Sequence, residues 1–319
     1  MKRFVKKLLL FALIFCVTIL TLDVLSTVEP FRKWIAYLTE SKDYYYPLDT
    51  KNEVRDIYLG MIREEGDYTK LVVGDSVCNQ MLNDLHDLNK DYCIVGNNRA
   101  LTLAGEYLLI QEFFEYHEGV TDVYLIIGFD MLMTNIDETF GYSYVVAPFA
   151  QEGMLENLEE GTLEEIRERF GTVFTQNPVV GMVERSAVNQ KLYLNYLKDQ
   201  AAEKTFSGDL RLSEVAARYL VKINELCEEK GAVLHLLPDP LSGGYDRHIQ
   251  AEMLRADFEY RGLQSMFPNY FEEVSYYPEE QFGDGVHFGE PYNTREALNQ
   301  KVRELYLDRG YLEGLVLEE

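Results

Sequence analysis

Positive charge is scarce in this 319-residue sequence, in which Lys and Arg total 30 against 54 Asp and Glu. The resulting net charge of −24 repels nucleic-acid phosphates, so we expect no nucleic-acid partner. Cysteine is also scarce. The four cysteines include no CxxC spacing, so nothing indicates a zinc knot, a redox motif or a disulfide framework.

The composition is otherwise that of a folded protein. Hydrophobic residues make up 47% of the chain and charged residues 26%, which is enough to bury a sizeable core in one large or two small domains. The 23 tyrosines and 17 phenylalanines argue against disorder.

The N-terminus carries a one-sided charge pattern. "MKRFVKK" holds four positive charges, and the uncharged run "LLLFALIFCVTILTL" follows it. We interpret residues 1–28 as a cytoplasmic basic flank and a single-pass signal-anchor helix in the cell membrane, which leaves the main domain outside the cytoplasm. A cleaved signal peptide is the alternative, but no convincing small-x-small cleavage site follows. A buried helix fits the flanking charges poorly.

A regular rhythm of strands and helices begins after a membrane-proximal connector at 29–69. Apolar runs predict strands, and apolar residues at helical spacing predict helices. The expected strands are 70–76, 91–98, 122–130 and 232–241, and the expected helices are 103–117, 212–231, about 246–264 and about 291–309. The rhythm fails between about 135 and 205, which we interpret as an insertion that could cover a site. The predicted domain is 70–319.

This alternation predicts an α/β fold with a mainly parallel sheet covered by helices on both faces. In such sheets, ligands bind outside the carboxyl ends of the strands. Ser76, Asn98 and Asp130 each follow a predicted strand, so we expect all three at that edge.

Ser76 in "VVGDSVC" is a candidate nucleophile, and a serine nucleophile needs a base and an orienting acid. His287 lies in the turn-rich stretch "GDGVHFG", with Asp284 three residues before it. That spacing lets the carboxylate reach one ring nitrogen while the other faces outward. The other histidines are given ordinary roles: His235 inside a strand, and His86, His117 and His248 in solvated positions.

Each candidate also has a purely structural interpretation. Ser76 could cap the following helix, because Asp and Ser are favoured N-caps. The Asp284–His287 pair could be an ordinary turn contact. Asn98 could simply serve its turn, and Arg99 could form a surface ion pair. Cys78 is expected to act as a small apolar residue and not as a reactive thiol.

"GDS" after the first strand and "DGVH" before the last helix resemble the first and last sequence blocks of the SGNH/GDSL hydrolase superfamily. The resemblance implies a flavodoxin-like three-layer α/β/α fold. It also implies a Ser76–His287–Asp284 triad that uses no metal or organic cofactor.

The middle blocks depart from that family. Oxyanion donors there usually come from the Ser backbone, a Gly and an Asn. Here the second strand ends in "VGNNRALTLAG", where Asn98 or the Ala100 backbone could serve, and the third ends in "GFDM", which places Asp130 where an Asn is usual. Three alternatives stay open: Asp130 is not the corresponding residue, Asn98 substitutes for it, or the activity is weakened.

Together with an exported membrane anchor, the resemblance implies an esterase or O-acyltransferase acting on acyl esters, expected to be acetyl esters, of cell-envelope glycans. The implied partners are an acylated glycan or another ester, the membrane, and a membrane-bound acyl donor. The alternative is a catalytically inactive SGNH-fold module that binds or scaffolds an envelope assembly.

Overall fold

A computed structural model describes residues 2–26, 54, 57–136, 141–170 and 210–318. Four strands in this part form a sheet in the order β2-β1-β3-β4. They are β1 (Lys70–Gly74), β2 (Tyr92–Gly96), β3 (Asp122–Ile127) and β4 (Val233–Pro238). Every neighbouring pair is parallel, which confirms the predicted α/β class and its parallel sheet. The order matches the first four positions of the flavodoxin-like order 2-1-3-4-5.

The central strand β1 is buried on both faces. Val72 lies opposite Ile94 and Tyr124, whereas Val73 lies opposite Val95 and its row points to the other face. Each of the two rows belongs to a different apolar cluster. The strands therefore appear in the sequence as continuous apolar runs, as expected for a parallel sheet with both faces covered.

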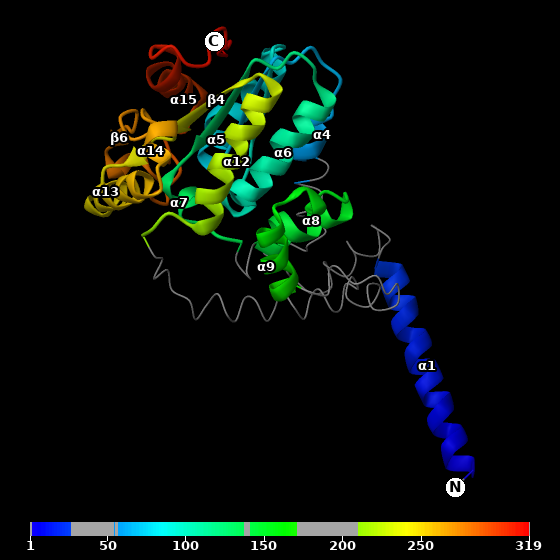
Figure 1. The fold of residues 1–319 in the computed structure, drawn as a ribbon. Helices are drawn as coiled ribbons and strands as arrows, with labels where there is room; N and C mark the ends of the chain where they lie inside the picture. Colours follow the sequence, from blue (N-terminus) through cyan, green and yellow to red (C-terminus); the bar gives the residue numbers. More distant parts are fainter. Residues whose placement is uncertain (1, 27–53, 55–56, 137–140, 171–209, 319) are drawn as a thin grey trace.

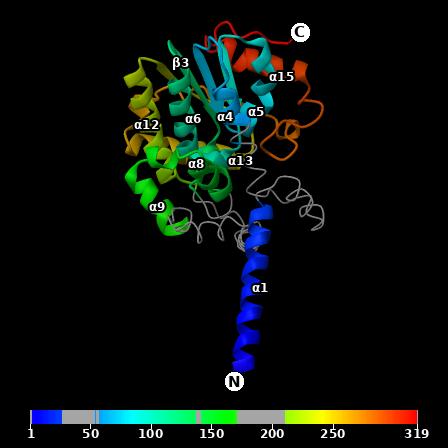
Figure 2. The ribbon, with the colours of Figure 1, turned by 90° about the vertical axis from the view of Figure 1, so that its right-hand side faces the viewer.

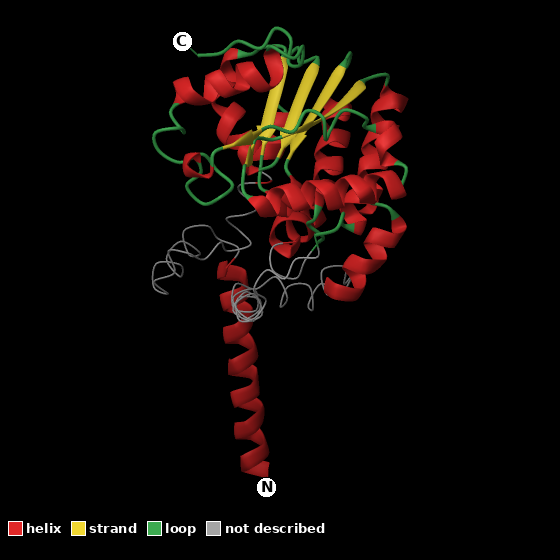
Figure 3. Cartoon of the chain, turned by 90° about the vertical axis from the view of Figure 1, so that its left-hand side faces the viewer, coloured by secondary structure: helices red, strands yellow, loops and turns green. Residues whose placement is uncertain are grey.

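Helices cover both faces of the sheet (Figure 1 and Figure 3). One face packs against α4 (Leu59–Ile62), α6 (Thr102–Tyr116) and α12 (Glu214–Lys230). The other packs against α5 (Ser76–Leu82) and α15 (Arg295–Val302). In Figure 3 the sheet lies between these helices, which gives the arrangement three layers.

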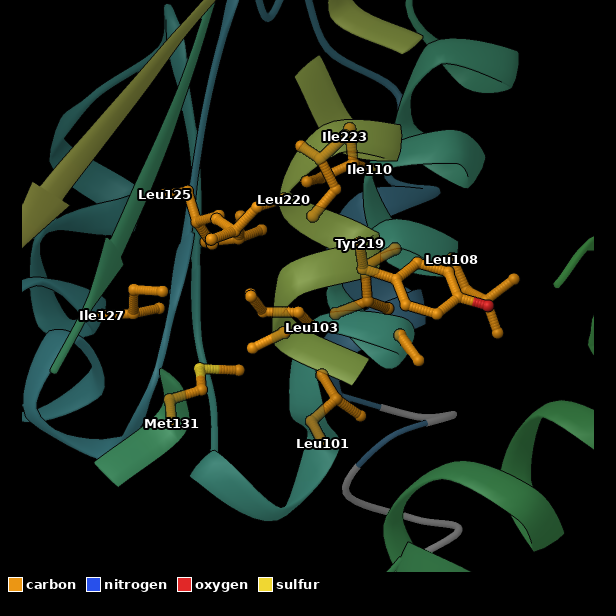
Figure 4. Packing of buried hydrophobic residues seen from close by; sticks show 14 of the residues in the cluster. Leu101, Leu103, Leu108, Ile110, Leu125, Ile127, Met131, Tyr219, Leu220 and Ile223 are labelled. Carbon is orange, nitrogen blue, oxygen red and sulfur yellow. The ribbon is translucent and has the colours of Figure 1, made fainter. Parts of the chain in front are cut away.

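Figure 4 shows mainly aliphatic side chains between β3, α6 and α12, together with Met131 and the hydroxyl-bearing ring of Tyr219. Leu125 and Ile127 of β3 point toward Leu103 of α6 and Leu220 of α12, and all four side chains are fully buried. Truncating such a leucine to alanine typically costs about 2–5 kcal/mol. This core fixes the ends of the strands from which the candidate site is built.

Local signals define the ends of α12. The Ser213 hydroxyl accepts a hydrogen bond from the Ala216 N–H at 2.9 Å and caps the start of the helix. Gly231 ends the helix with a left-handed φ of 78°, which glycine adopts without steric cost. The helix predicted at 212–231 is confirmed.

The remaining described elements lie outside the four-stranded sheet. They are α7 (Phe129–Leu132), α8 (Ala147–Gln151), α9 (Glu160–Phe170), α13 (Tyr245–Tyr260), α14 (Leu263–Met266), the two-stranded sheet of β5 (Leu241–Ser242) and β6 (Tyr276–Tyr277), the 3-10 helices η2 (Asn83–Leu88), η3 (Arg99–Leu101), η5 (Leu155–Asn157) and η7 (Glu279–Gln281), and the π-helical turns η4 (Tyr142–Val146) and η8 (Arg303–Leu307). Figure 2 shows α8 and α9 near α6 and α12. Phe149 and Leu163 bury their side chains in the same cluster as those helices. The rest of the predicted insertion, 171–205, lies outside the described residues.

The N-terminal run forms the helix α1 (Lys2–Ser26). Among the described residues, no helix combines the length and apolarity needed to cross a membrane. The predicted membrane span stays a prediction.

Most of the predicted connector lies outside the described residues, but Leu59 and Ile62 of α4 are fully buried in the domain core. That core therefore includes residues before position 70.

Candidate active site

Asp75 turns the chain at the carboxyl end of β1. Its Oδ1 accepts hydrogen bonds from the N–H groups of Val77 at 3.0 Å and Cys78 at 3.5 Å, and its Oδ2 accepts one from Gly128 at 2.9 Å. Asp75 is thus the N-cap of α5 and also ties α5 to the end of β3. The alternative in which Ser76 is the cap is wrong. Ser76 is the first helical residue, and its side chain is half-buried.

The structure brings Ser76, His287 and Asp284 together. His287 Nε2 lies 2.8 Å from Ser76 Oγ, and His287 Nδ1 lies 2.8 Å from Asp284 Oδ2. With Nδ1–H donating to the carboxylate, Nε2 accepts from the serine hydroxyl. This is the hydrogen-bond order that a serine nucleophile and its base require.

The turn that carries His287 is organised by Asp284 itself. Asp284 Oδ1 accepts hydrogen bonds from the N–H groups of Val286 at 3.0 Å and His287 at 2.7 Å. Partial burial opposes ionisation, but these bonds and the imidazole contact lower the pKa of Asp284 to about 2. The carboxylate therefore stays ionised at neutral pH and holds the ring in one orientation.

Gln80 fastens the histidine turn to the serine helix. Its Nε2 donates to the Phe288 carbonyl at 2.9 Å, and its Oε1 accepts from the Phe288 N–H at 3.0 Å. Gln80 is four residues after Ser76, so both project from the same face of α5. Sequence reasoning missed this residue, although the i, i+4 spacing from the candidate nucleophile is a usable signal.

Asp130 is paired rather than free. Arg247 donates to both of its carboxylate oxygens, at 3.1 and 2.9 Å, and Arg99 lies 3.9 Å from it. Asp130 belongs to α7 and not to the strand end, because β3 stops at Ile127. The guanidinium of Arg247 offsets the carboxylate charge. Arg247 was not found from the sequence, because it lies 117 positions away with no motif around it.

Asn98 and Ala100 lie in the turn after β2. The side-chain oxygen of Asn98 accepts the Ala100 N–H at 2.9 Å and caps η3, which agrees with the structural interpretation of Asn98. The Ala100 N–H is therefore already used as a donor. Neither residue lines the pocket that contains Ser76, whereas the intervening Arg99 does.

A second carboxyl group, that of Asp239, lies at the carboxyl end of β4 and was not predicted. Burial, followed by the neighbouring charge of Asp75, raises its pKa well above the ordinary value. Burial thus favours the protonated form of Asp239 beside Asp75, whose own pKa is also raised by burial. Gly128 permits this approach, since a Cβ there would lie 2.5 Å from both carboxyl oxygens of Asp239.

A small pocket surrounds Ser76, with a volume of about 20 Å³. Its wall is formed by the loops after β1, β3 and β4 and by the turn before His287. The lining residues are Asp75, Ser76, Arg99, Gly128, Asp130, Asp239, Pro240, Leu241, Ser242, Arg247, Gly285 and Val286. The volume is close to that of one bound water by the same measure, so the pocket suits a small group.

The other histidines are outside this site. His86 and His117 are buried, which corrects the prediction that they are solvated. Both rings can be buried because backbone groups hydrogen-bond to their nitrogens. His86 Nδ1 accepts a hydrogen bond from the Ile94 N–H, and His117 Nε2 lies 2.7 Å from the Ile62 carbonyl. His235 is satisfied as expected, with Nε2 2.8 Å from Asp122, although a quarter of its side chain is exposed.

Comparison with known proteins gives little further guidance. No protein-family model matches the chain, and no curated protein does. One solved structure, provisionally described as a platelet activating factor from Streptococcus pneumonia, is similar at 14% identity and a TM-score of 0.37. The match covers 86% of this chain and 99% of that one. A match this weak does not bear on function.

Proposed function

We propose that this chain is an SGNH-like serine esterase or O-acyltransferase that acts on acetyl or similarly small acyl esters of cell-envelope glycans. The main support for this proposal is a pair of hydrogen bonds, each 2.8 Å long. One joins Ser76 Oγ to His287 Nε2, and the other joins His287 Nδ1 to Asp284. The small volume of the pocket around Ser76 favours a short acyl group over a long one.

The proposed reaction has two halves. Ser76 Oγ attacks the acyl carbonyl while His287 Nε2 accepts its proton, and Asp284 stabilises the imidazolium that forms. The tetrahedral intermediate collapses, the C–O bond to the leaving alkoxide breaks, and His287 protonates that oxygen. Water or a sugar hydroxyl then gives its proton to His287 and attacks the acyl-enzyme. The bond between the acyl carbon and Ser76 Oγ breaks, and His287 returns the proton to Oγ.

The developing oxyanion needs donors. The first backbone N–H of α5, that of Ser76, is one candidate, because those of Val77 and Cys78 are used by Asp75. Asn98 does not line the pocket that contains Ser76, so its side-chain amide is not a second donor in this arrangement. Asp130 is not a donor, and its charge is offset by Arg247.

Ester hydrolysis tests this function. The full chain should hydrolyse 4-nitrophenyl acetate and release acetate from an O-acetylated glycan, and Ser76→Ala should lower both rates by about 10³-fold or more. 4-Nitrophenyl decanoate should be a much poorer substrate. Equal rates for the parent and Ser76→Ala would instead favour the inactive binding module as the alternative function.

The cellular location is part of the proposal. In this account α1 lies in the cell membrane with its N-terminus in the cytoplasm, and the domain faces outward beside a membrane-bound acyl donor. Support comes from the basic flank and from the apolar side chains that α1 exposes, such as Leu9 at 64% and Phe11 at 68%.

A further inference from the structure

A larger cavity adjoins the pocket around Ser76. It has a volume of about 680 Å³ and shares Arg99 and Asp130 with that pocket. Its wall combines η3, α7 with the residues after it, the segment that leads into α12, and α13 with the residue after it. The lining residues are Arg99, Asp130, Met133, Thr134, Asn135, Leu210, Arg211, Leu212, Ser213, Glu214, Gln250, Asp257, Tyr260 and Arg261. We call this space the α13 cavity.

Charges on this wall are matched in pairs. Arg211 donates to Asp257 at 2.7 Å, and Arg261 donates to both carboxylate oxygens of Glu214. Asp130 is held by Arg247 in the same way. An anionic ligand would have to displace a carboxylate from its arginine partner. A cationic ligand would have to displace an arginine from its carboxylate partner. The described wall therefore favours a neutral polar ligand over either ion.

Neutral hydrogen-bonding groups face the same space. The side-chain oxygens of Asn135 and Gln250 accept hydrogen bonds from the Val215 N–H at 3.4 Å and from Arg247 at 3.0 Å. Within the described part of the chain, their amide nitrogens have no hydrogen-bond partner and remain as donors, and the paired carboxylates have further lone pairs as acceptors. Such planar groups match the adjacent hydroxyls of a sugar.

Tyr260 adds an aromatic surface at the rim. It is the last residue of α13, and 89% of it is exposed. A large aromatic side chain this exposed gains no stability from burial, whereas its ring face can pack on the apolar C–H face of a sugar ring.

We propose that the α13 cavity is a subsite for a neutral sugar unit, with Tyr260 as its stacking platform. It would hold the glycan whose ester reaches Ser76. Its place in the reaction rests on the proposed function, but its binding of sugar does not, because no step of catalysis is needed for it.

Binding by the full chain carrying Ser76→Ala tests the subsite separately from catalysis. The probes are chitotriose and maltotriose as neutral sugars and trigalacturonate as the anionic one, each titrated by calorimetry. We expect a neutral trisaccharide to bind more tightly than trigalacturonate. Adding Tyr260→Ala should weaken that binding at least about tenfold, and Tyr260→Trp should restore it.

Tyr116→Ala in the same background is the matched control. Tyr116 is 54% exposed and ends α6 at the opposite edge of the sheet, so its loss should leave sugar binding unchanged. Both tyrosines are exposed, so neither variant should alter folding, which circular dichroism checks. Three results would overturn the proposal. They are that neither neutral sugar binds, that trigalacturonate binds more tightly, or that Tyr260→Ala binds the sugar as tightly as its Ser76→Ala background. Sugar binding without esterase activity would refute only the proposed function.

Discussion

The carboxylate of Asp130 faces the pocket around Ser76, where negative charge would develop during ester cleavage. Arg247 holds it with hydrogen bonds of 3.1 and 2.9 Å. Removing the guanidinium with Arg247→Met leaves only the more distant Arg99, 3.9 Å away, to offset that charge. We expect kcat/KM for 4-nitrophenyl acetate to fall about 10- to 100-fold, which corresponds to about 1.4–2.8 kcal/mol. Adding Asp130→Asn should recover most of the loss, because the charge is then gone.

Arg255→Met is the control for this pair. Arg255 also lies on α13, but it is half-exposed and pairs with Glu272 on the surface. Its loss should leave the rate unchanged. A double variant no faster than Arg247→Met alone would show that Arg247 acts through its packing and not through its charge.

The ends of β1, β3 and β4 meet at a buried pair of carboxyl groups, Asp75 and Asp239. Since the pKa of Asp239 is raised in the folded chain, folding takes up a proton there above the unfolded pKa. The contribution of Asp239 to the free energy of unfolding should therefore be greatest at low pH and fall as pH rises. Asp239→Asn removes this contribution and leaves that of Asp75, whose pKa is also raised by burial. Above pH 5, we expect the free energy of unfolding of this variant to rise relative to that of the parent by up to about 1.4 kcal/mol per pH unit.

Urea unfolding at pH 5, 7 and 8.5 measures this difference. The exposed Asp308→Asn is the control, and it should follow the parent at each pH. A free energy of unfolding for Asp239→Asn that runs parallel to that of the parent would show that Asp239 is ionised in the folded chain.

The four strands of the sheet and the helices α6, α12 and α13 could be predicted from the sequence, because each carries a local signal. The strands at 91–98 and 122–130 were predicted at the right places, but they end at Gly96 and Ile127. Their polar ends turn into η3 and α7, whose formation depends on capping and ion-pair contacts. Asp130 was misplaced for that reason, since its partner Arg247 comes from a distant helix.

At the level of the whole molecule, the order of strands and turns along the chain predicted which residues form the site better than the residues around each position did. Ser76 and His287 are 211 positions apart, yet parallel topology places the first strand and the last turn at one edge. The α13 cavity could not be predicted, because its wall is assembled from four segments with no motif in common. The described residues include none from 171–209, where part of the predicted insertion lies.

The location of the molecule depends on α1. We expect the full chain to remain in the membrane fraction after alkaline carbonate extraction. Leu9→Glu with Leu13→Glu should release it, since each charge costs about 2.5–3.5 kcal/mol within a bilayer. Leu88→Glu, at a 45% exposed leucine of the domain, should not. Complete extraction of the parent would refute the membrane anchor.

Labelling of the full chain with a fluorophosphonate tests the central claim most directly, because only an activated serine reacts rapidly with it. We predict one labelled peptide, containing Ser76, in the parent. Ser76→Ala should abolish labelling, and His287→Ala should slow it by about 10³-fold or more. No labelling of a folded parent, or equal labelling of the parent and His287→Ala, would contradict the account of Ser76 as a nucleophile activated by His287.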